Sequence, residues 1–218
     1  MDAFVGEHLI RTFGPATAVR DVSCVVPAAA RIAVTGVSGS GKTTLLHIVA
    51  GIDEPTAGTA RWPSIGGHPR SHPGLVGVVL QRPGLLPALD VAENVSLPLL
   101  LAGRTPDAAR EAAAETLARL DLTDLSTRLP HELSGGQAQR VAVARAVAAD
   151  PGLIVADEPT AALDSTGAAH LVDVLLAAAD RLGAALVVAT HDDAVAGRLE
   201  HRWRMANGVV RRGPETAC

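Results

Sequence analysis

An eight-residue stretch at positions 36–43, GVSGSGKT, constrains this chain more than any other feature. Glycines at the spacing G-x-x-x-x-G-K-T let successive backbone N–H groups curl around phosphates, the lysine reaches the β and γ groups, and the threonine hydroxyl can bind Mg²⁺. Residues 31–35 are an apolar run of strand type, and residues 42–50 read as a helix. A loop between a strand and a helix N-terminus favours an anion. The sequence therefore predicts a site for a nucleoside triphosphate, with these candidate contacts: Gly36, Ser38, Gly39, Ser40, Gly41, Lys42, Thr43 and Thr44.

Lys42 is the only lysine in the chain, and the other basic residues among the 19 are all arginines. Lysine carries a compact ammonium group on a flexible stem, whereas arginine carries a planar fork, so the two differ most where a point charge must reach a phosphate. The lysine at this one position therefore supports the phosphate interpretation of the loop.

Composition excludes several classes of protein. The chain has 218 residues, of which 48% are hydrophobic and 19% charged, and this predicts one domain with a large packed core. No apolar run reaches about 20 residues, so we expect no membrane-spanning helix, and the first residues lack the pattern of a secretory signal. Two cysteines, Cys24 and Cys218, are too few for a disulfide framework and predict a reducing, cytosolic location. A net charge of −4 argues against nonspecific nucleic-acid binding.

The order of apolar runs predicts an α/β fold. Residues 3–30 read as short strands with a turn at Gly14 and Pro15, which indicates an antiparallel layer. Further strands are expected at 31–35, 74–81, 153–156 and 185–190, and helices at 42–50, 105–120, 134–149 and 166–179. Asn207 and Gly208 are typical of a hairpin turn, and residues 213–218 are expected to fray. Continuous apolar strands that alternate with helices indicate a mainly parallel sheet with an antiparallel edge layer.

Two carboxylates, Asp157 and Glu158, follow the apolar run at 153–156. Open α/β sheets bind their ligands at the carboxyl ends of the strands. A phosphate site needs one carboxylate to hold the metal ion and another to orient the attacking water, so Asp157 suits the metal and Glu158 suits the general base. The alternative is a pair of solvated acids at a strand end. The phosphate loop in the same chain favours the catalytic interpretation.

The sequence LSGGQ at positions 133–137 opens a long helix. Ser134 and Gln137 have capping-box spacing. A helix N-terminus opened by Ser134, Gly135 and Gly136 exposes N–H groups and a hydroxyl, which is a second potential anion site. Such a cap is common by itself, so its meaning depends on the other motifs.

Taken together, the motifs resemble those of the nucleotide-binding subunits of ATP-binding cassette (ABC) transporters. Six of them occur in the family's order and cover almost the whole chain: Walker A at 36–43, the Q-loop glutamine at Gln81, the LSGGQ signature at 133–137, Walker B at 153–158, the D-loop at 162–164 and the switch histidine at His191. Residues 85–89 and 92–100 further resemble the lipoprotein-release, macrolide-export and cell-division branch of the family.

The resemblance implies ATP hydrolysis with ATP and Mg²⁺ as cofactors. Two copies of the chain would close head to tail, so that each ATP lies between the phosphate loop of one copy and residues 134–137 of the other. Closure would move a transmembrane permease subunit. The resemblance therefore implies a peripheral protein on the inner, cytoplasmic face of the cell membrane, with no insertion into the membrane and no nucleic-acid partner.

The resemblance also implies roles for single residues within one domain, 1–218, that contains a helical subdomain at about 82–150. Phe13 would stack on adenine where the family often has tyrosine, and His191 would sense the γ-phosphate. Gln81 would contact the metal and the attacking water, which makes the implied metal set Thr43, Gln81 and Asp157. Asp164 joins the nucleotide contacts, together with Ser134, Gly135, Gly136 and Gln137.

Several alternatives stay open at this point. A P-loop kinase or GTPase would explain Lys42 but not the signature, a DNA-repair ATPase would need a long coiled-coil insertion, and a translation-associated protein generally carries two cassettes. The alternative function is a non-transport ABC-type ATPase that regulates a membrane or DNA-associated complex. The connector between Lys42 and Gln81 is shorter than is usual for the branch. Outside the motifs we expect structural residues, not ligands: Arg140, Arg145, His68 and His72.

Overall fold

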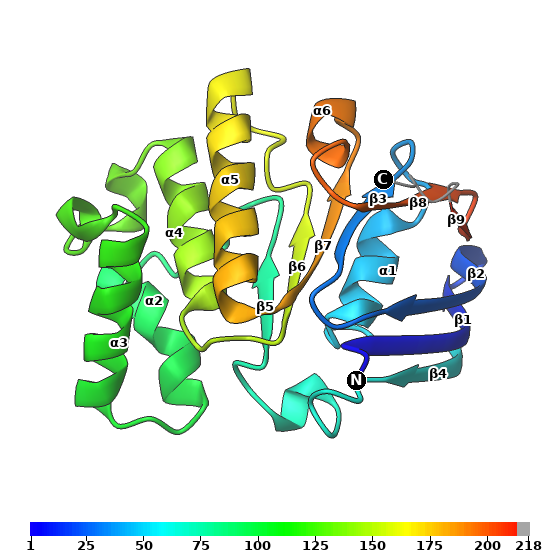
Figure 1. Cartoon of the computed structure of the whole chain (residues 1–218), viewed down its shortest axis with the longest axis horizontal. Coiled ribbons are helices and arrows are strands. Elements are labelled where there is room, and N and C mark those ends of the chain that lie inside the picture. The colour runs from blue at the N-terminus through cyan, green and yellow to red at the C-terminus, as the bar shows by residue number, and fades with distance from the viewer. Residues whose placement is uncertain (213–218) are drawn as a thin grey trace.

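The computed structural model of this chain describes residues 1–212, and the expectation of fraying at 213–218 lies outside them. A six-stranded sheet forms the centre of the molecule (Figure 1). Its spatial order is β5 (Val76–Val79), β6 (Leu153–Asp157), β7 (Ala185–Thr190), β3 (Arg31–Thr35), β8 (His201–Ala206) and β9 (Val209–Arg212). All neighbours are parallel except β8 and β9. The predicted α/β fold with a mainly parallel sheet is confirmed.

The register of the central strands brings their carboxyl ends to one edge of the sheet. Thr35 at the end of β3 pairs with Thr190 at the end of β7, and Asp157 at the end of β6 pairs with Ala189. The loops that follow these three strands therefore start side by side. Each carries residues that the sequence predicts to bind phosphate or to catalyse its transfer.

A second, antiparallel sheet has the order β2 (Ala16–Val26), β1 (Phe4–Phe13) and β4 (Ala57–Arg61). The predicted antiparallel layer is present, but β1 and β2 are 10 and 11 residues long and were expected to be short. The pairing of β1 with β2 contains register shifts. His8 and Asp21 are polar residues within these strands and have positive φ angles of 51° and 52°. β4 was not predicted, because its residues are mostly exposed and show no apolar alternation.

Helices cover both faces of the main sheet. α1 (Lys42–Val49) lies between the two sheets, and α5 (Ser165–Leu182) covers the opposite face (Figure 1). The short α6 (Asp193–Ala196) follows β7. The apolar cluster around α1 includes Leu45, Leu46 and Ile48, all fully buried. Burial of each such side chain contributes about 1.5–3 kcal/mol to folding.

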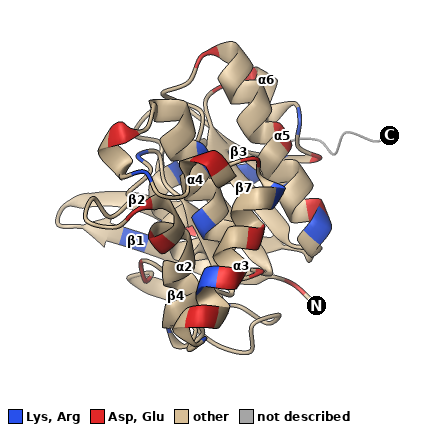
Figure 2. Ribbon diagram, turned by 90° about the vertical axis from the view of Figure 1, so that its left-hand side faces the viewer, with Lys and Arg blue, Asp and Glu red and all other residues tan. Residues whose placement is uncertain are grey.

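Three helices, α2 (Val91–Leu101), α3 (Pro106–Arg119) and α4 (Gly135–Val147), form one end of the molecule and share an apolar cluster of their own. This end faces the viewer in Figure 2, where acidic and basic positions are interspersed along α3. α2 was not predicted, because Pro98 interrupts a leucine-rich run without a helical period. Three short 3₁₀ turns complete the described chain: Pro69–Ser71, Thr123–Leu125 and Pro130–Glu132.

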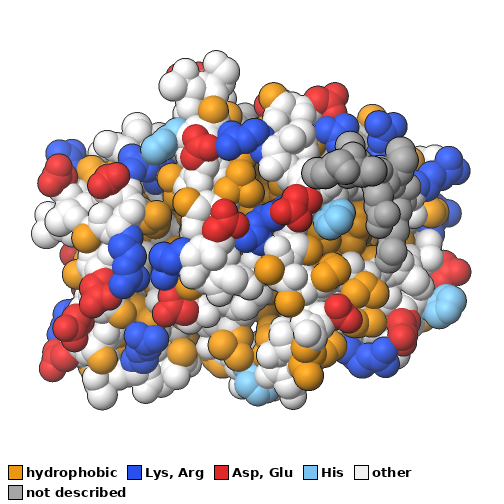
Figure 3. Space-filling view, viewed as in Figure 1, with side chains coloured by type: hydrophobic (Ala, Val, Ile, Leu, Met, Phe, Trp, Pro, Cys, Tyr) orange, Lys and Arg blue, Asp and Glu red, His pale blue; other side chains and the backbone are white. Residues whose placement is uncertain are grey.

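The surface carries mixed charge. On the face shown in Figure 3, acidic and basic side chains are interspersed and no large area has a single sign. Within residues 1–212, none of the helices combines the length and the hydropathy that crossing a bilayer requires. The predicted hairpin turn is present, since Asn207 and Gly208 join β8 to antiparallel β9 with φ angles of 50° and 80°.

Candidate active site

A cavity of about 690 Å³ opens where the loops after β3, β5, β6 and β7 meet the end of β1. Ten of the predicted site residues line it: Phe13, Ser38, Gly39, Gly41, Lys42, Thr43, Thr44, Gln81, Glu158 and His191. Ala18 and Val37 also line it and were not predicted. Val37 occupies a variable position of the loop motif, and Ala18 belongs to no motif, so only tertiary structure reveals them.

The phosphate loop approaches the surrounding backbone closely, and this requires glycine. A Cβ atom on Gly36 would lie 2.2 Å from the carbonyl oxygen of Met205, and one on Gly41 would lie 2.2 Å from that of Ala18. Gly41 also has a φ angle of 104°, which disfavours other residues. It precedes α1 without a side-chain cap, and the first turn of α1 contains no acidic residue. The N–H groups of this helix N-terminus are therefore available to an anion.

Lys42 is held in the position that the loop motif predicts. Its side chain is 7% exposed, and its Nζ donates to the carbonyl oxygens of Gly36 at 2.8 Å and Val37 at 3.3 Å. Nζ also lies 3.6 Å from Oε1 of Glu158. The ammonium group of the only lysine is thus directed along the inside of the loop, next to a carboxylate at the end of β6.

Asp157 is a buried carboxylate with an unused oxygen. It is 6% exposed, and its Oδ1 has no hydrogen-bond partner among the described residues. Burial raises the pKa of Asp157 above its ordinary value, while a hydrogen bond from Thr43 and the charges of His47 and Lys42 oppose the rise. A bound cation would supply the missing partner, and an aspartate oxygen beside a threonine hydroxyl is a donor set that suits Mg²⁺. The residues present therefore fit this ion.

Glu158 and His191 are already in contact. Nδ1 of His191 lies 2.8 Å from Oε2 of Glu158, whose own backbone N–H donates to the carbonyl oxygen of Ala189. Glu158 has a φ angle of 45°, an uncommon conformation for a non-glycine residue. Backbone strain of this kind costs about 1–3 kcal/mol and concentrates at functional sites. The strained turn directs the Glu158 carboxylate between Lys42 and His191.

The signature residues lie elsewhere. Residues 134–137 and Asp164 are absent from the described lining of the cavity. Oγ of Ser134 accepts from the N–H of Gln137 at 3.2 Å, and Oε1 of Gln137 accepts from the N–H of Ser134 at 2.9 Å, which confirms the predicted capping box. Asp164 caps α5 by accepting from the N–H of Gly167 at 2.7 Å. The hydrogen bonds described for Ser134, Gln137 and Asp164 are thus made within their own helix ends and not to the phosphate loop.

Side chains of α4 donate hydrogen bonds to the backbone on both sides of Gln81. Nε2 of Gln139 donates to the carbonyl oxygen of Leu80 at 3.1 Å, and Arg145 donates to those of Pro83 and Gly84 at 2.8 and 2.7 Å. The side chain of Gln81 itself lies at the cavity, beyond the end of β5. The predicted buried strand at 74–81 is thus shorter than expected and only half-buried.

Several polar residues for which the sequence analysis expects no ligand role make contacts outside the cavity. Arg140 donates to the carbonyl oxygen of Leu120 at 2.5 Å. The His68 ring packs edge to face against Trp62 at 4.8 Å, and His72 contacts the carbonyl oxygen of His68. Among the described residues, no cluster of three or more His, Cys, Asp or Glu side chains could hold a metal ion.

This fold and this cavity define a nucleoside-triphosphate-binding domain of the P-loop class. The chain belongs to the ABC transporter family, whose model matches residues 19–161, more than half of the 218 residues. The family predicted from the motifs is confirmed.

Curated relatives include members of the branch that residues 85–100 resemble. The ATP-binding protein LolD of the lipoprotein-releasing system from Bacteroides thetaiotaomicron is 35% identical over 213 residues, which cover 94% of this chain and 98% of that protein. LolD from Idiomarina loihiensis is also 35% identical, over 90% of this chain and 89% of that protein. The macrolide export ATP-binding/permease protein MacB of Rhodopseudomonas palustris is 38% identical over 88% of this chain, but this match covers only 30% of MacB.

The solved structures that resemble this chain are also ABC transporter proteins. The dimeric bacterial ABC transporter cassette MJ0796 is 31% identical, with a TM-score of 0.88 over 99% of this chain and all of that one. A post-hydrolysis dimer of MJ0796 bound to ADP and Pi matches to the same degree. CbiO1 from Clostridium perfringens, part of an ABC transporter complex, is 26% identical with a TM-score of 0.84 over 97% of this chain and 88% of that one.

Proposed function

We propose that this protein is the ATP-binding and ATP-hydrolysing subunit of an ABC transporter. The observation that carries the proposal is the cavity at the carboxyl edge of the sheet, where the phosphate loop, Glu158, His191 and Gln81 converge. The arrangement offers an ammonium group for the β and γ phosphates, an acceptor for the proton of water and a polar group at the position of the γ-phosphate. These are the parts that hydrolysis of a phosphoanhydride needs.

Each residue then has a defined task. Lys42 and the loop N–H groups neutralise the phosphate charge, and Phe13 supports the base. Thr43, Gln81 and Asp157 would hold Mg²⁺, which supplies charge neutralisation at the phosphate oxygens when bound. Glu158 accepts a proton from water as the water oxygen forms its bond to the γ-phosphorus and the bond from that phosphorus to the β–γ bridging oxygen breaks. The products are ADP and inorganic phosphate, and His191 contacts the transferred group.

A second copy of the chain would complete the site. Residues 134–137 and Asp164 do not belong to the described lining of the cavity in their own chain. In a dimer, this surface would face the γ-phosphate held by the neighbouring copy. The dimeric MJ0796 cassettes support this arrangement. Each nucleotide would bind the closed dimer more tightly than the open one, and this difference would drive the movement.

The partner of the dimer would be a transmembrane permease subunit. LolD is named for a lipoprotein-releasing system, and MacB carries ATP-binding and permease parts in one protein. We place this chain on the inner, cytoplasmic face of a membrane as a peripheral subunit. In this proposal residues 1–218 form one ATP-binding domain, with a helical subdomain at about 82–150 that contains α2, α3 and α4.

The decisive experiment replaces Glu158 by glutamine, which keeps the shape of the side chain but accepts no proton. We expect ATP binding to persist while turnover falls about 10²–10⁴-fold, since this is the usual cost of losing a general base. Gel filtration with ATP should show a trapped dimer. Glu115→Gln, the same change on the exposed face of α3, is the matched control and should leave turnover unchanged. A monomeric Glu158→Gln variant with full activity would contradict both the base and the closed dimer.

A further inference from the structure

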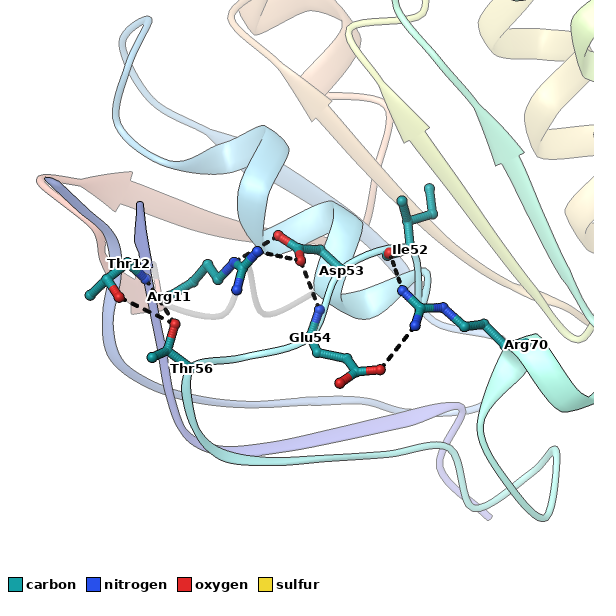
Figure 4. A network of polar contacts seen from close by, with 7 residues as sticks. All are labelled: Arg11, Thr12, Ile52, Asp53, Glu54, Thr56 and Arg70. Atoms are coloured by element: carbon teal, nitrogen blue, oxygen red, sulfur yellow. Dashed lines mark hydrogen bonds and ion pairs between the residues drawn. The ribbon is translucent and has the colours of Figure 1, made fainter. Parts of the chain in front are cut away.

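A network of polar contacts joins the end of β1 to the segment after α1 (Figure 4). Nε of Arg11 donates to Oδ2 of Asp53 at 2.8 Å, and its Nη2 lies 2.7 Å from Oδ1 of the same carboxylate. The two side chains are 26% and 23% exposed. A bidentate, mostly buried pair of this kind holds both groups in one orientation, unlike a flexible surface pair.

The same guanidinium group lies over an aromatic ring. Cζ of Arg11 is 4.6 Å from the centroid of the Phe13 ring, which is within the range of a cation–π contact. Arg11 and Phe13 are two residues apart on β1, so they share one face of the strand. Phe13 is 50% exposed and lines the cavity, whereas Arg11 lies outside the described lining. One face of the ring is thus covered by Arg11, and the cavity side remains open.

Asp53 is fixed in turn to the helix that starts at the phosphate loop. Its N–H donates to the carbonyl oxygen of His47 in the last turn of α1. Arg70 braces the same segment, because it donates to the carbonyl oxygen of Ile52 at 2.7 Å and to Oε1 of Glu54 at 3.0 Å (Figure 4). α1 therefore carries Lys42 at its first turn and sets the position of Asp53 beyond its last.

We propose that Arg11 is a positioning residue for the nucleotide base. Its guanidinium group, anchored by Asp53, holds the Phe13 ring so that the opposite face of the ring accepts the base of ATP. This inference rests on the proposed function, because it assumes that Phe13 contacts the base. It adds a residue from outside the cavity to the determinants of nucleotide affinity, and it links the base side of the site to α1 and so to the phosphate side.

The two sides of the site can be separated with two ligands. Tripolyphosphate occupies the phosphate loop but has no base, so the ratio of its dissociation constant to that of ATP measures how much the base contributes. In Arg11→Met, we expect ATP to bind about two- to fivefold more weakly, which is the usual size of an exposed cation–π contact, while tripolyphosphate binding stays constant. Calorimetry with both ligands, together with the unfolding midpoint of each variant, gives these quantities.

Arg61→Met is the matched control. Arg61 lies on β4 of the same antiparallel sheet and pairs with Glu7 at 2.8 Å, away from Phe13, so its loss should leave both affinities unchanged. Asp53→Asn is the second variant, since it nearly preserves side-chain size but removes the anchor of Arg11, and it should weaken ATP binding in the same direction. In a Phe13→Ala background, Arg11→Met should cause no further loss of ATP affinity.

The possible results distinguish this inference from the proposed function. If the unaltered protein binds neither ligand, the proposed function fails. If it binds both ligands but Arg11→Met and Asp53→Asn leave the ratio unchanged, or shift both affinities together with the unfolding midpoint, Arg11 is a structural residue and the inference is overturned. A further loss in the Phe13→Ala background would equally overturn it, because Arg11 would then act without the ring.

Discussion

The phosphate loop and the signature end of α4 differ in how well each satisfies its own polar groups. The phosphate side contains two buried oxygens without partners among the described residues, Oγ of Ser40 and Oδ1 of Asp157, and a glutamate with a strained backbone. At the signature end Ser134 and Gln137 satisfy each other, and the nearest buried atom without a partner on α4 is Nε of Arg140, one turn further on. One region is prepared for a ligand at the expense of stability, and the other is a stable helix end.

In the proposed function, this difference separates the residues that give nucleotide affinity from those that act on dimer closure. A lone chain already holds Lys42 in the loop, so it should bind ATP without help. Its Ser134 is already hydrogen-bonded within its own helix end, and in the proposed dimer it would act only on a nucleotide held by another chain. Substitutions at three positions, Lys42, Ser134 and Asp157, test this separation.

The largest effect is expected from Lys42→Ala. The ammonium group would make at least two charged hydrogen bonds to the phosphates, each worth about 1.5–3 kcal/mol, so ATP binding should weaken about 10²–10⁴-fold. Lys42→Arg should fail nearly as badly, because the buried pocket beside Gly36 suits a point charge and not a planar fork. Calorimetry on the lone subunit measures both. Unchanged affinity in either variant would remove the phosphate loop from the site.

Ser134→Arg should leave ATP binding by a lone subunit intact but prevent closure, because a bulky cation would separate the two faces. A mixture of Ser134→Arg with Lys42→Ala is the sharper test, since the mixed dimer keeps one site with both residues unaltered. The mixture should regain some ATP-driven dimerisation that neither variant shows alone. If crosslinking detects mixed dimers and nothing is regained, the site is not shared between chains.

Asp157→Asn should stabilise the nucleotide-free protein. Burial raises the native pKa of Asp157, so the folded state holds this proton more tightly than the unfolded chain. The contribution of this group to stability is therefore complete below the ordinary pKa of aspartate and is lost as the pH rises through the native value. We expect the free energy of unfolding to increase at neutral pH and above, and we expect this gain to shrink toward acidic pH. Chemical denaturation at several pH values measures it, and a loss at neutral pH would refute the stated cost of this carboxylate.

Ser134→Ala at the signature end should lower the free energy of unfolding. It removes a helix cap, and such substitutions typically cost about 1 kcal/mol of stability. Thr105→Ala at the start of α3 is the matched control, because it also removes a helix cap. The cap hydrogen bond is 3.4 Å long at Thr105 and 3.2 Å long at Ser134, and the loss of the Thr105 cap should not affect dimer closure. If Ser134→Ala leaves stability unchanged, the signature end is not the self-sufficient region that its hydrogen bonds indicate.

Local patterns predicted most of the central fold. The strands at 31–35, 153–156 and 185–190 are continuous apolar runs that only a buried sheet position accommodates, and Thr105 and Ser134 are strong helix caps. β4 escaped prediction because its pairing with β1 depends on tertiary contact and not on its own exposed residues. α2 could have been found from its capping box, Asp90 with Glu93, despite Pro98.

The candidate site was predictable as far as its residues occur in motifs. The loop glycines, Lys42 and the two carboxylates at the end of β6 follow from spacing alone. Ala18 lines the cavity from β2, and Arg11 is held against Phe13 by Asp53, which lies beyond α1. Such contributions depend on how distant segments pack, which no local pattern encodes.

The close packing of the phosphate-loop glycines has a genetic consequence. The nearest obstacles to a side chain at Gly36 and Gly41 are the main-chain oxygens of Met205 and Ala18, which any residue at those positions would retain. A second-site substitution can make a side chain smaller, but it cannot remove a backbone carbonyl. Suppressor screens that start from alanine at either glycine should therefore recover revertants and no compensating replacement at position 18 or 205.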